Sequence, residues 1–501
     1  MSIRSPLLVT TLALAAAAAI ATPANAIING RESTEPYAFL GSLQAPGAPG
    51  SNSHGCGVTV VAPQWVLTAS HCARVPTLAK NGTPRGWKVR IGSLNTKSGG
   101  ELVDVDKFYR LATERESYFG RDHALLHLAT PVQAKPIRIA SSTPPDGTAV
   151  RFVGWGNMCE DGKPPCYPGR LHEADFVVQP LSTCPPGIPD AEICLSSPDK
   201  ADVGNTDSGG PALVREGDEW VIAGTLTGHS ESRQALFTDA SKHLDWINGI
   251  INGTNVPPDD VRPSLEGSVN LGNCMGSVVR MPDAKPEDPA LMLTNGHCVE
   301  GDRPAPGAAM VDQHADREVP IADSEGYDKT TAKANRLVYA TMTGTDIALY
   351  RLDKTYGQLA TEGAKVFDLT TNPVKAGAKV TVLKSVLPEN CTAEAVVPHL
   401  KEDGYLLDNS IRYEQTDDCG PGHGASGSPL IAPDGNTVVG VHNTSNEKGE
   451  QCTANNPCEV DADGNETSTA GRRYGQQIDM IPACFTGSTL ELTKPGCTLK
   501  S

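Results

Sequence analysis

The chain has 501 residues, and its 42 Lys and Arg against 59 Asp and Glu leave a formal net charge of -17. This acidic balance argues against a nucleic-acid-binding protein, whose surface must neutralise phosphates. Hydrophobic residues make up 39% and charged residues only 20%, while 50 Gly and 39 Pro supply many turns. This composition predicts a globular, all-β protein of about two to four domains and excludes a membrane channel, a coiled coil and a chromatin protein.

The first 26 residues have the pattern of a secretory signal peptide. Arg4 gives a short positive region, residues 7–21 form a Leu- and Ala-rich apolar run, and residues 24–26 form a small-residue cleavage site. The alternative is a membrane anchor, but the run is short for a span, and no later segment approaches about 18 consecutive apolar residues. We therefore predict secretion to the extracellular space, where the fourteen Cys can form disulfides.

Short apolar runs separated by turn residues predict β-strands along the rest of the chain. They include 58–61, 87–91, 150–153, 220–223 and 378–383. Residues 240–251 instead carry Leu244, Ile247 and Ile251 at helical spacing, and Gly253 can end that helix. A polar, Pro-rich, acidic segment follows. These signals predict a first domain over 27–252 that ends in a short helix, a linker over 253–266 and a second domain over 267–501.

Three short motifs recur in the same order in both halves of the chain. They are a His-Cys pair after an apolar run, an Asp before apolar residues, and a Ser in a Gly-rich stretch. Their central residues are His71, Asp122 and Ser208 in the first half and His297, Asp346 and Ser426 in the second. The separation from His to Asp is 51 and 49 residues, and from Asp to Ser it is 86 and 80. Three ordered matches indicate an internal duplication.

These residue types are the ones that nucleophilic catalysis requires. A serine hydroxyl is a weak nucleophile until a base removes its proton, and a neutral imidazole does this near neutral pH. A carboxylate fixes the tautomer of the imidazole and stabilises its cation. Glycines around the serine let backbone N–H groups turn toward a developing oxyanion. The motifs therefore indicate two candidate catalytic triads.

The chain resembles the chymotrypsin/trypsin family of serine proteases, most closely over 27–252. Besides the three motifs, the segments Gly154-Trp155-Gly156, Leu236-Phe237-Thr238 and 243–248 are similar to that family. The resemblance implies an all-β fold of two tandem trypsin-like double β-barrel domains, with a short C-terminal helix in the first. It also implies a serine-type endopeptidase that acts through an acyl-enzyme.

The resemblance assigns roles to the residues of the three motifs. The general bases are His71 and His297, their orienting partners are Asp122 and Asp346, the nucleophiles are Ser208 and Ser426, and oxyanion donors are Thr206 and Gly424. Family disulfides are implied for Cys56–Cys72, Cys184–Cys194 and Cys274–Cys298. Cys159 and Cys166 remain to close a short loop, and the other pairings of the second half stay open.

The segment Ile27-Ile28-Asn29-Gly30 resembles the N-terminus that activating cleavage frees in this family. The freed ammonium of Ile27 would pair with Asp207, which directly precedes Ser208. Because Ile27 also directly follows the signal cleavage site, we hypothesise that signal peptidase itself generates the activating terminus. The alternative is that Ile27 is merely a residue of the first strand.

Asp202 lies six residues before Ser208, where trypsin-like members carry the Asp that binds Arg or Lys side chains. The alternative is a solvated loop charge. Several residues depart from the family pattern in ways that affect the pocket and its surroundings. They are Thr206 in place of Gly, His123 in place of an apolar residue, Ala235 in place of Gly, and Thr227-Gly228-His229 in the pocket wall.

The second half resembles the glutamyl-endopeptidase branch through residues 424–429 and Val439-Gly440-Val441-His442. Ala425 replaces the carboxylate that would receive a free amine, which implies a different activation. In that branch a histidine at the position of His442 helps to bind an acidic side chain, so a preference for Glu or Asp is a hypothesis. The alternative is a strand-end histidine that only fills space.

Three functional interpretations follow from these patterns. The first is a secreted endopeptidase with two active domains that cleaves proteins or peptides. The second has an active first domain and a regulatory pseudoprotease as the second. The third is a non-catalytic binding or adhesion protein built on protease folds, although six intact triad members speak against it. We expect no cofactor, no metal, no nucleic acid, no membrane partner, and a monomer.

Overall fold

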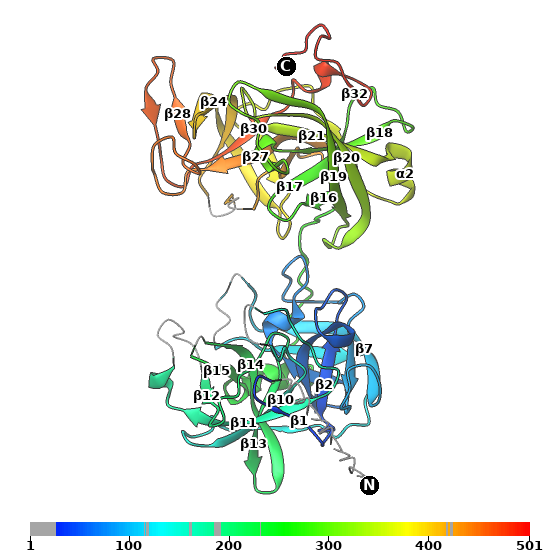
Figure 1. Cartoon of the computed structure of the whole chain (residues 1–501), viewed down its shortest axis with the longest axis vertical. Coiled ribbons are helices and arrows are strands. Elements are labelled where there is room, and N and C mark those ends of the chain that lie inside the picture. Colours follow the sequence, from blue (N-terminus) through cyan, green and yellow to red (C-terminus); the bar gives the residue numbers. More distant parts are fainter. Residues whose placement is uncertain are drawn as a thin grey trace, which may run out of the picture. The chain divides into compact units, whose positions relative to one another are not determined.

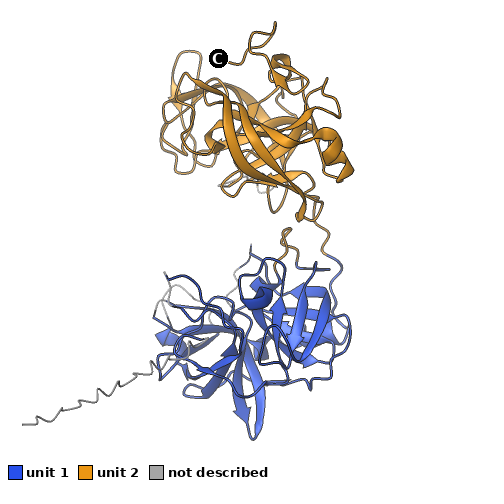
Figure 2. Ribbon diagram, turned by 45° about the vertical axis from the view of Figure 1, so that its right-hand side comes forward, with its two compact units in different colours: residues 1–73, 80–259 blue, residues 74–79, 260–501 orange. Residues whose placement is uncertain are grey.

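The computed structural model describes residues 27–114, 116, 120–159, 163–184, 192–230, 232–416, 419–420 and 424–500. The predicted signal peptide, residues 1–26, lies outside them. The chain divides into two compact units (Figure 2), the first containing residues 1–73 and 80–259 and the second containing 74–79 and 260–501. Each unit is described by itself below as unit 1 and unit 2.

The first barrel of unit 1 is a closed ring of antiparallel strands in the order β2-β3-β4-β8-β7-β6, with β6 paired back to β2 (Figure 1). The strands are β2 (Leu40–Gln44), β3 (His54–Ala62), β4 (Trp65–Thr68), β6 (Lys88–Ile91), β7 (Glu101–Arg110) and β8 (Ala124–Leu128). The short strand β5 (Asn81–Gly82) pairs with β7.

The second barrel of unit 1 closes in the order β10-β13-β14-β15-β12-β11. Its strands are β10 (Ala149–Gly154), β11 (His172–Gln179), β12 (Ile193–Ser196), β13 (Pro211–Glu216), β14 (Glu219–His229) and β15 (Ala235–Asp239). The short strands β1 (Arg31–Glu32) and β9 (Arg138–Ile139) pair with β11 and β14. Phe152 fills this core and contacts Phe176 and Phe237 edge to face, at centroid distances of 6.4 and 5.8 Å.

Unit 2 repeats this plan. Its first barrel closes in the order β16-β19-β20-β21-β18-β17, with strands β16 (Ser268–Asn270), β17 (Met275–Arg280), β18 (Pro289–Thr294), β19 (Ala309–Ala322), β20 (Asp328–Thr341) and β21 (Ile347–Thr355). Its second closes in the order β27-β26-β23-β24-β25-β30, with strands β23 (Lys379–Val382), β24 (Glu389–Glu402), β25 (Tyr405–Tyr413), β26 (Pro429–Ile431), β27 (Thr437–Ser445) and β30 (Arg473–Gln477).

The remaining strands of unit 2 are short. They are β22 (Phe367–Leu369), which pairs in parallel with both β17 and β27, β28 (Cys458–Val460), β29 (Glu466–Thr467), β31 (Phe485–Thr486) and β32 (Thr489–Leu490). The barrel order in both units confirms the all-β fold with tandem double barrels that the sequence predicts.

The two α-helices of the described chain are α1 (Leu244–Ile251) and α2 (Tyr356–Thr361). Helix α1 follows a 3-10 turn at Ala240–His243, and Asp239 caps that turn by accepting the Ser241 backbone N–H. It confirms the predicted short helix of the first domain. In the part of the chain that the structure describes, no helix is long and apolar enough to cross a membrane.

All fourteen cysteines form disulfides, and every disulfide joins residues of the same unit. The pairs are Cys56–Cys72, Cys159–Cys166, Cys184–Cys194, Cys274–Cys298, Cys391–Cys419, Cys452–Cys458 and Cys484–Cys497. The Cys56–Cys72 and Cys274–Cys298 bridges anchor the segments that carry His71 and His297, so each candidate base is held by a covalent link to its first barrel.

Candidate active sites

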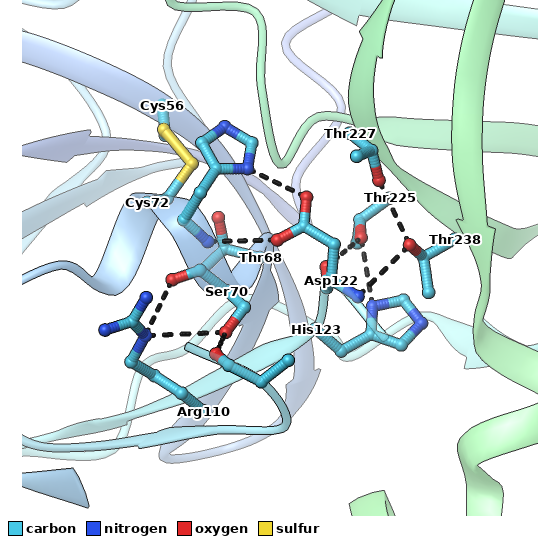
Figure 3. A network of polar contacts seen from close by, with 12 residues as sticks. Cys56, Thr68, Ser70, Cys72, Arg110, Asp122, His123, Thr225, Thr227 and Thr238 are labelled. Atoms are coloured by element: carbon cyan, nitrogen blue, oxygen red, sulfur yellow. Dashed lines mark hydrogen bonds and ion pairs between the residues drawn. A yellow bond between two sulfur atoms is a disulfide. The ribbon is translucent and has the colours of Figure 1, made fainter. Parts of the chain in front are cut away.

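In unit 1, Asp122 binds His71 with both carboxylate oxygens. One oxygen lies 2.8 Å from His71 Nδ1 and the other accepts the His71 backbone N–H at 2.9 Å. Asp122 is fully buried, and hydroxyls of Thr225 and Thr238 contact its backbone (Figure 3). The carboxylate therefore fixes the ring so that Nδ1 carries the proton and Nε2 is the basic nitrogen.

Ser208 lies in the tight loop that precedes β13. Its carbonyl accepts the Gly57 backbone N–H at 2.8 Å. Gly209 has a φ of 75°, and a Cβ there would lie 2.1 Å from Thr68 Oγ1, so the loop requires glycine. The backbone N–H groups of Thr206 and Ser208 donate to no atom of the described residues. Both groups therefore remain available to an oxyanion.

Thr206 is held in a strained conformation. Its φ is 74°, which is unfavourable for a β-branched residue, and its buried hydroxyl has no partner among the described residues. Its carbonyl lies 3.1 Å from His54 Nε2, and His54 Nδ1 lies 2.7 Å from Ser42 Oγ. Burial lowers the pKa of His54 to about 4, so the neutral ring donates from Nε2 and accepts from Ser42. No sequence motif marks His54 or Ser42, so neither residue was predicted.

His123 is buried directly behind the candidate triad. Thr225 Oγ1 lies 3.0 Å from its Nδ1, and His243 packs edge to face against it. Burial, with a contribution from the charge of His243, lowers the pKa of His123 to about 4. The ring is therefore neutral at physiological pH and supplies packing, not charge, beside Asp122.

The His123→Leu variant should be less sensitive to acid than the parent. Between pH 6.5 and about 4, the unfolded chain binds a proton at His123 that the folded chain does not bind, so the free energy of unfolding falls as the pH falls. This loss approaches about 3 kcal/mol at the acid end, and leucine removes it. Calorimetry compares the melting temperature of unit 1 at pH 7.5 and pH 5. The drop in melting temperature should be smaller in His123→Leu than in the control His127→Leu, which replaces a partly exposed ring beside Asp106. Equal drops in both variants would contradict this.

Unit 2 has the same arrangement around His297. Asp346 lies 2.6 Å from His297 Nδ1 with one oxygen and accepts the His297 backbone N–H at 3.0 Å with the other. Burial disfavours the imidazolium, but the charge of Asp346 and its hydrogen bond outweigh burial and raise the pKa of His297. A Cβ at Gly296 would lie 2.1 Å from the Thr341 carbonyl, which explains the glycine before this histidine.

The loop of Ser426 matches that of Ser208 in its backbone conformation and in the bond to its serine carbonyl. The Ser426 carbonyl accepts the Met275 backbone N–H at 2.7 Å. Gly424 and Gly427 have φ values of 79° and 82°, where Thr206 and Gly209 have 74° and 75°. The backbone N–H groups of Gly424 and Ser426 donate to no atom of the described residues. Unit 2 thus offers the same two candidate donors without the strain of a β-branched side chain.

The Ser426 hydroxyl bonds to a backbone carbonyl in this structure, where its Oγ donates to the Asn443 carbonyl at 3.2 Å. Hydrogen bonds between a catalytic serine and its histidine are often long in unliganded enzymes and tighten when substrate binds. The candidate nucleophiles Ser208 and Ser426 thus lie in loops of matching backbone geometry.

Comparison with known proteins identifies the family. Residues 27–247 match the Trypsin family, and residues 275–441 match the Trypsin-like peptidase domain. The chain is 31% identical over 237 residues to trypsin from Sarcophaga bullata, and the match covers 44% of this chain and 87% of that protein. The chain belongs to the trypsin family of serine proteases. It is a serine-type endopeptidase, and its substrates are proteins or peptides.

The matches to other relatives each cover less than half of this chain, about the length of one unit. The thrombin-like enzyme halystase from Gloydius blomhoffii is 27% identical, with 45% of this chain and 97% of that protein covered. Transmembrane protease serine 9 from Rattus norvegicus is 31% identical over 39% of this chain, but the match spans only 19% of that protein. The solved structure of neuropsin, a serine protease of mouse brain, is 22% identical over 45% of this chain and all of its own, with a TM-score of 0.38.

Asp202 contacts a histidine of the same pocket wall. Its carboxylate oxygens lie 3.3 and 3.4 Å from His229 Nδ1, and its side chain is 6% exposed, against 35% for His229. Sequence analysis noted His229 as a departure in the wall but not this contact. The carboxylate that the family resemblance assigns to substrate binding is therefore paired with a histidine in this structure.

Asp207 is buried below the Ser208 loop, where its oxygens accept the Gly156 and Gly204 backbone N–H groups, each at 2.8 Å. Burial raises the pKa of Asp207 to about 7. The side chain of Ile27 is fully buried among the residues of the second barrel core. The Asp202 backbone N–H donates to the Ile28 carbonyl at 3.0 Å, which ties the N-terminal segment to the segment leading to Asp207.

His442 lies with the triad of unit 2 around a cavity of about 280 Å³, lined by His297, Asp346, Ser426, Asn443 and Ser445 among others. It stacks on Tyr413 at a centroid distance of 5.9 Å. Burial first, and then the charges of Lys384 and Arg473, lower the pKa of His442 to about 3. Its Nδ1 and the side-chain N of Asn443 are buried without partners among the described residues.

Among the described residues, every group of His, Cys, Asp or Glu side chains close enough to share a metal ion contains two cysteines joined in a disulfide. The three groups are Cys56 with His71 and Cys72, Cys274 with His297 and Cys298, and Cys452 with Cys458 and Glu466. Because disulfide sulfur has no thiolate to donate, these groups do not form metal sites while the bridges are intact.

Proposed function

We propose that the protein is a secreted endopeptidase in which both units hydrolyse peptide bonds through a His-Asp-Ser triad. The observation that carries the proposal is the duplicated geometry. In each unit a buried Asp forms hydrogen bonds with the backbone N–H and Nδ1 of the candidate base. Two backbone N–H groups of each serine loop donate to no described residue. The N-terminal pattern and the seven disulfides support secretion.

The proposed reaction proceeds in two halves. Nε2 of His71 takes the proton of Ser208 Oγ as this oxygen attacks the substrate carbonyl, and the N–H groups of Thr206 and Ser208 stabilise the oxyanion. The imidazolium then protonates the leaving amine, and the acyl-enzyme remains. Water attacks the ester, again with His71 as base, and releases the acid. His297, Ser426 and Gly424 act in the same way in unit 2.

A regulatory pseudoprotease in unit 2 is the second candidate, and a non-catalytic binding protein is the third. Neither role requires Asp346 to hold His297 through two hydrogen bonds, nor Gly424 and Gly427 to keep the serine loop in its left-handed conformation. We therefore favour two active units.

The specificity of the two units is proposed to differ. In unit 1, Asp202 would attract Arg or Lys side chains, and His229 would compete for its carboxylate. In unit 2, His442 lines the cavity, and its Nδ1 has no partner among the residues that the structure describes. This supports a preference for Glu or Asp, with the neutral imidazole as a hydrogen-bonding group.

Replacing His229 with glycine should raise cleavage after Arg by unit 1 about tenfold, because Asp202 then loses its competing partner, and one charge-assisted hydrogen bond is worth about 1.5 kcal/mol. The measurement is kcat/KM for peptides with Arg, Lys or Leu before the cleaved bond, in a Ser426→Ala background. Cleavage after Leu should stay unchanged. Unchanged cleavage after Arg would show that the His229 contact does not limit access to Asp202.

For maturation, we propose that signal cleavage after Ala26 frees the Ile27 amine, which pairs with Asp207. Two observations support this maturation route: the Ile27 side chain is buried, and the backbones of Ile28 and Asp202 pair in an isolated antiparallel β-bridge. N-terminal sequencing of the secreted protein should begin at Ile27, and any other start would refute direct activation by signal peptidase.

The activity of both units is tested by digestion of a denatured protein with the mature chain and with Ser208→Ala, Ser426→Ala and the double variant. Mass spectrometry of the fragments should give two sets of cleavage sites, one lost in each single variant and both lost in the double variant. One set lost with Ser208→Ala and none with Ser426→Ala would favour the pseudoprotease interpretation.

A further inference from the structure

Strand register identifies the residues of unit 2 that are equivalent to those the family resemblance assigns to the specificity pocket of unit 1. In unit 1, β15 pairs with β14 so that Ala235 faces His229, and Asp202 lies six residues before Ser208. In unit 2, β30 pairs with β27 so that Arg473 faces Ser445, and Gly420 lies six residues before Ser426. Arg473 and Gly420 therefore occupy the places of Ala235 and Asp202.

The guanidinium of Arg473 lies against this glycine. Its Nη1 donates to the Cys419 carbonyl at 3.4 Å, and a Cβ at Gly420 would lie 3.7 Å from its Nη2. The Cys391–Cys419 disulfide holds that carbonyl in place. Ser445, the register partner of Arg473, lines the cavity that contains Ser426. Cross-strand partners project from the same face of a sheet, so the side chain of Arg473 lies on the same face as that of Ser445.

Arg473 differs from two nearby arginines in having no carboxylate partner among the described residues. Arg472 pairs with Glu394, and Arg412 pairs with Glu394 and Glu459. Among the described residues, no Asp or Glu forms an ion pair with Arg473. Glu389, which accepts the Gly420 backbone N–H at 2.8 Å, is itself paired with Lys384. Within the described part of the chain, the Cys419 carbonyl is thus the one hydrogen-bond acceptor of the Arg473 guanidinium.

We propose that Arg473 is the residue that selects acidic side chains in unit 2, by binding the carboxylate of the residue before the cleaved bond. The pocket base then carries opposite charges in the two units, a carboxylate at Asp202 and a guanidinium at Arg473. Guanidinium binds carboxylate with two parallel hydrogen bonds, a geometry that favours Glu or Asp over their amides.

This assignment changes the role of His442. The ring is 2% exposed, stacked on Tyr413 and neutral, so it supplies no positive charge. His442 and Asn443 line the cavity that contains Ser426, and His442 Nδ1 and the Asn443 side-chain N are buried with no partner among the described residues. They add hydrogen-bonding groups along the pocket, while Arg473 supplies the charge that separates Glu from Gln.

The kinetic test uses the mature full-length chain with Ser208→Ala, so that all cleavage comes from unit 2, and it rests on the proposed activity of Ser426. The substrates are peptides that differ only in Glu, Gln or Lys before the cleaved bond. Arg473→Met should lower kcat/KM for the Glu peptide about 100-fold and change the Gln peptide less than about threefold. Arg473→Lys should recover part of the preference, since it keeps the charge but not the planar fork.

Arg472→Met is the matched control, because it removes the same side chain one residue away, where the guanidinium pairs with Glu394. It should leave the preference for Glu over Gln intact. A preference that survives Arg473→Met, or that falls equally in both variants, would overturn the assignment.

A binding measurement separates this inference from the proposed activity. Calorimetry on the Ser208→Ala/Ser426→Ala chain compares acetylated peptide amides that end in Glu or Gln. The Glu peptide should bind at least about tenfold more tightly, and Arg473→Met should abolish the difference. Equal binding in the parent would overturn the role of Arg473. Failure of Ser426 to react with a fluorophosphonate would refute the activity of unit 2. The binding comparison of the Glu and Gln peptides would still decide the role of Arg473, because it needs no catalysis.

Discussion

The Asp122→Asn variant should lose about 10⁴-fold in the turnover of unit 1 while it stays folded, which is the scale of loss when a triad Asp becomes Asn. The amide cannot accept the Nδ1 proton and the backbone N–H of His71 together, so the imidazole is left in the wrong tautomer. Turnover is measured on a peptide with Arg before the cleaved bond, in a Ser426→Ala background.

Asp106→Asn is a suitable control, because Asp106 also contacts a histidine, lying 2.6 Å from His127 Nδ1 on the surface. Its removal should leave turnover within about twofold. Asp346→Asn should reproduce the effect of Asp122→Asn in unit 2. Full activity of Asp122→Asn would mean that the contact with His71 does not select the catalytic tautomer.

A methionine placed before Ile27 should lower the activity of unit 1 about 10²- to 10³-fold and leave unit 2 unaffected. Without a free amine at Ile27, the Asp207 carboxylate loses the proposed cation, and breaking a buried ion pair costs about 3–5 kcal/mol. Unit 2 needs no such pair, because Ala425 stands at the place of Asp207. The measurement is kcat/KM of each unit in the background where the other serine is alanine.

Asp207→Asn should give the same loss in a chain that starts at Ile27, and combining it with the added methionine should cause little further loss, since both changes remove one ion pair. Additive losses would show that the two residues act separately. Unchanged cleavage by unit 1 after the methionine extension would refute the proposed amine switch.

The sequence is sufficient to predict the barrels, the terminal helix of unit 1 and the order of the candidate triads. Alternating short runs such as 150–153 encode strands locally, and Leu244, Ile247 and Ile251 encode helix α1 by their spacing. Helix α2 was not predicted, although Thr355 and Gln358 form a capping box that marks its start. A helix of six residues is too short to show a helical spacing of apolar residues, so the capping box is its main sequence signal.

The contacts that we propose to set specificity could not be predicted from local sequence. His229 approaches Asp202, and Arg473 approaches Gly420, across strand registers and loops that only the closed barrels fix. His54 is 152 residues away from Thr206, whose carbonyl it contacts. Such pairs depend on long-range pairing, so a sequence reveals the residue types but not which of them meet.

The central proposal, that both units hold a reactive serine, is tested most directly by labelling with a fluorophosphonate followed by mass-spectrometric location of the adduct. The mature chain should carry one adduct on Ser208 and one on Ser426, and Ser208→Ala and Ser426→Ala should each lose only their own. Labelling of Ser208 alone would contradict an active unit 2, and a chain labelled at neither serine would contradict catalysis by either triad.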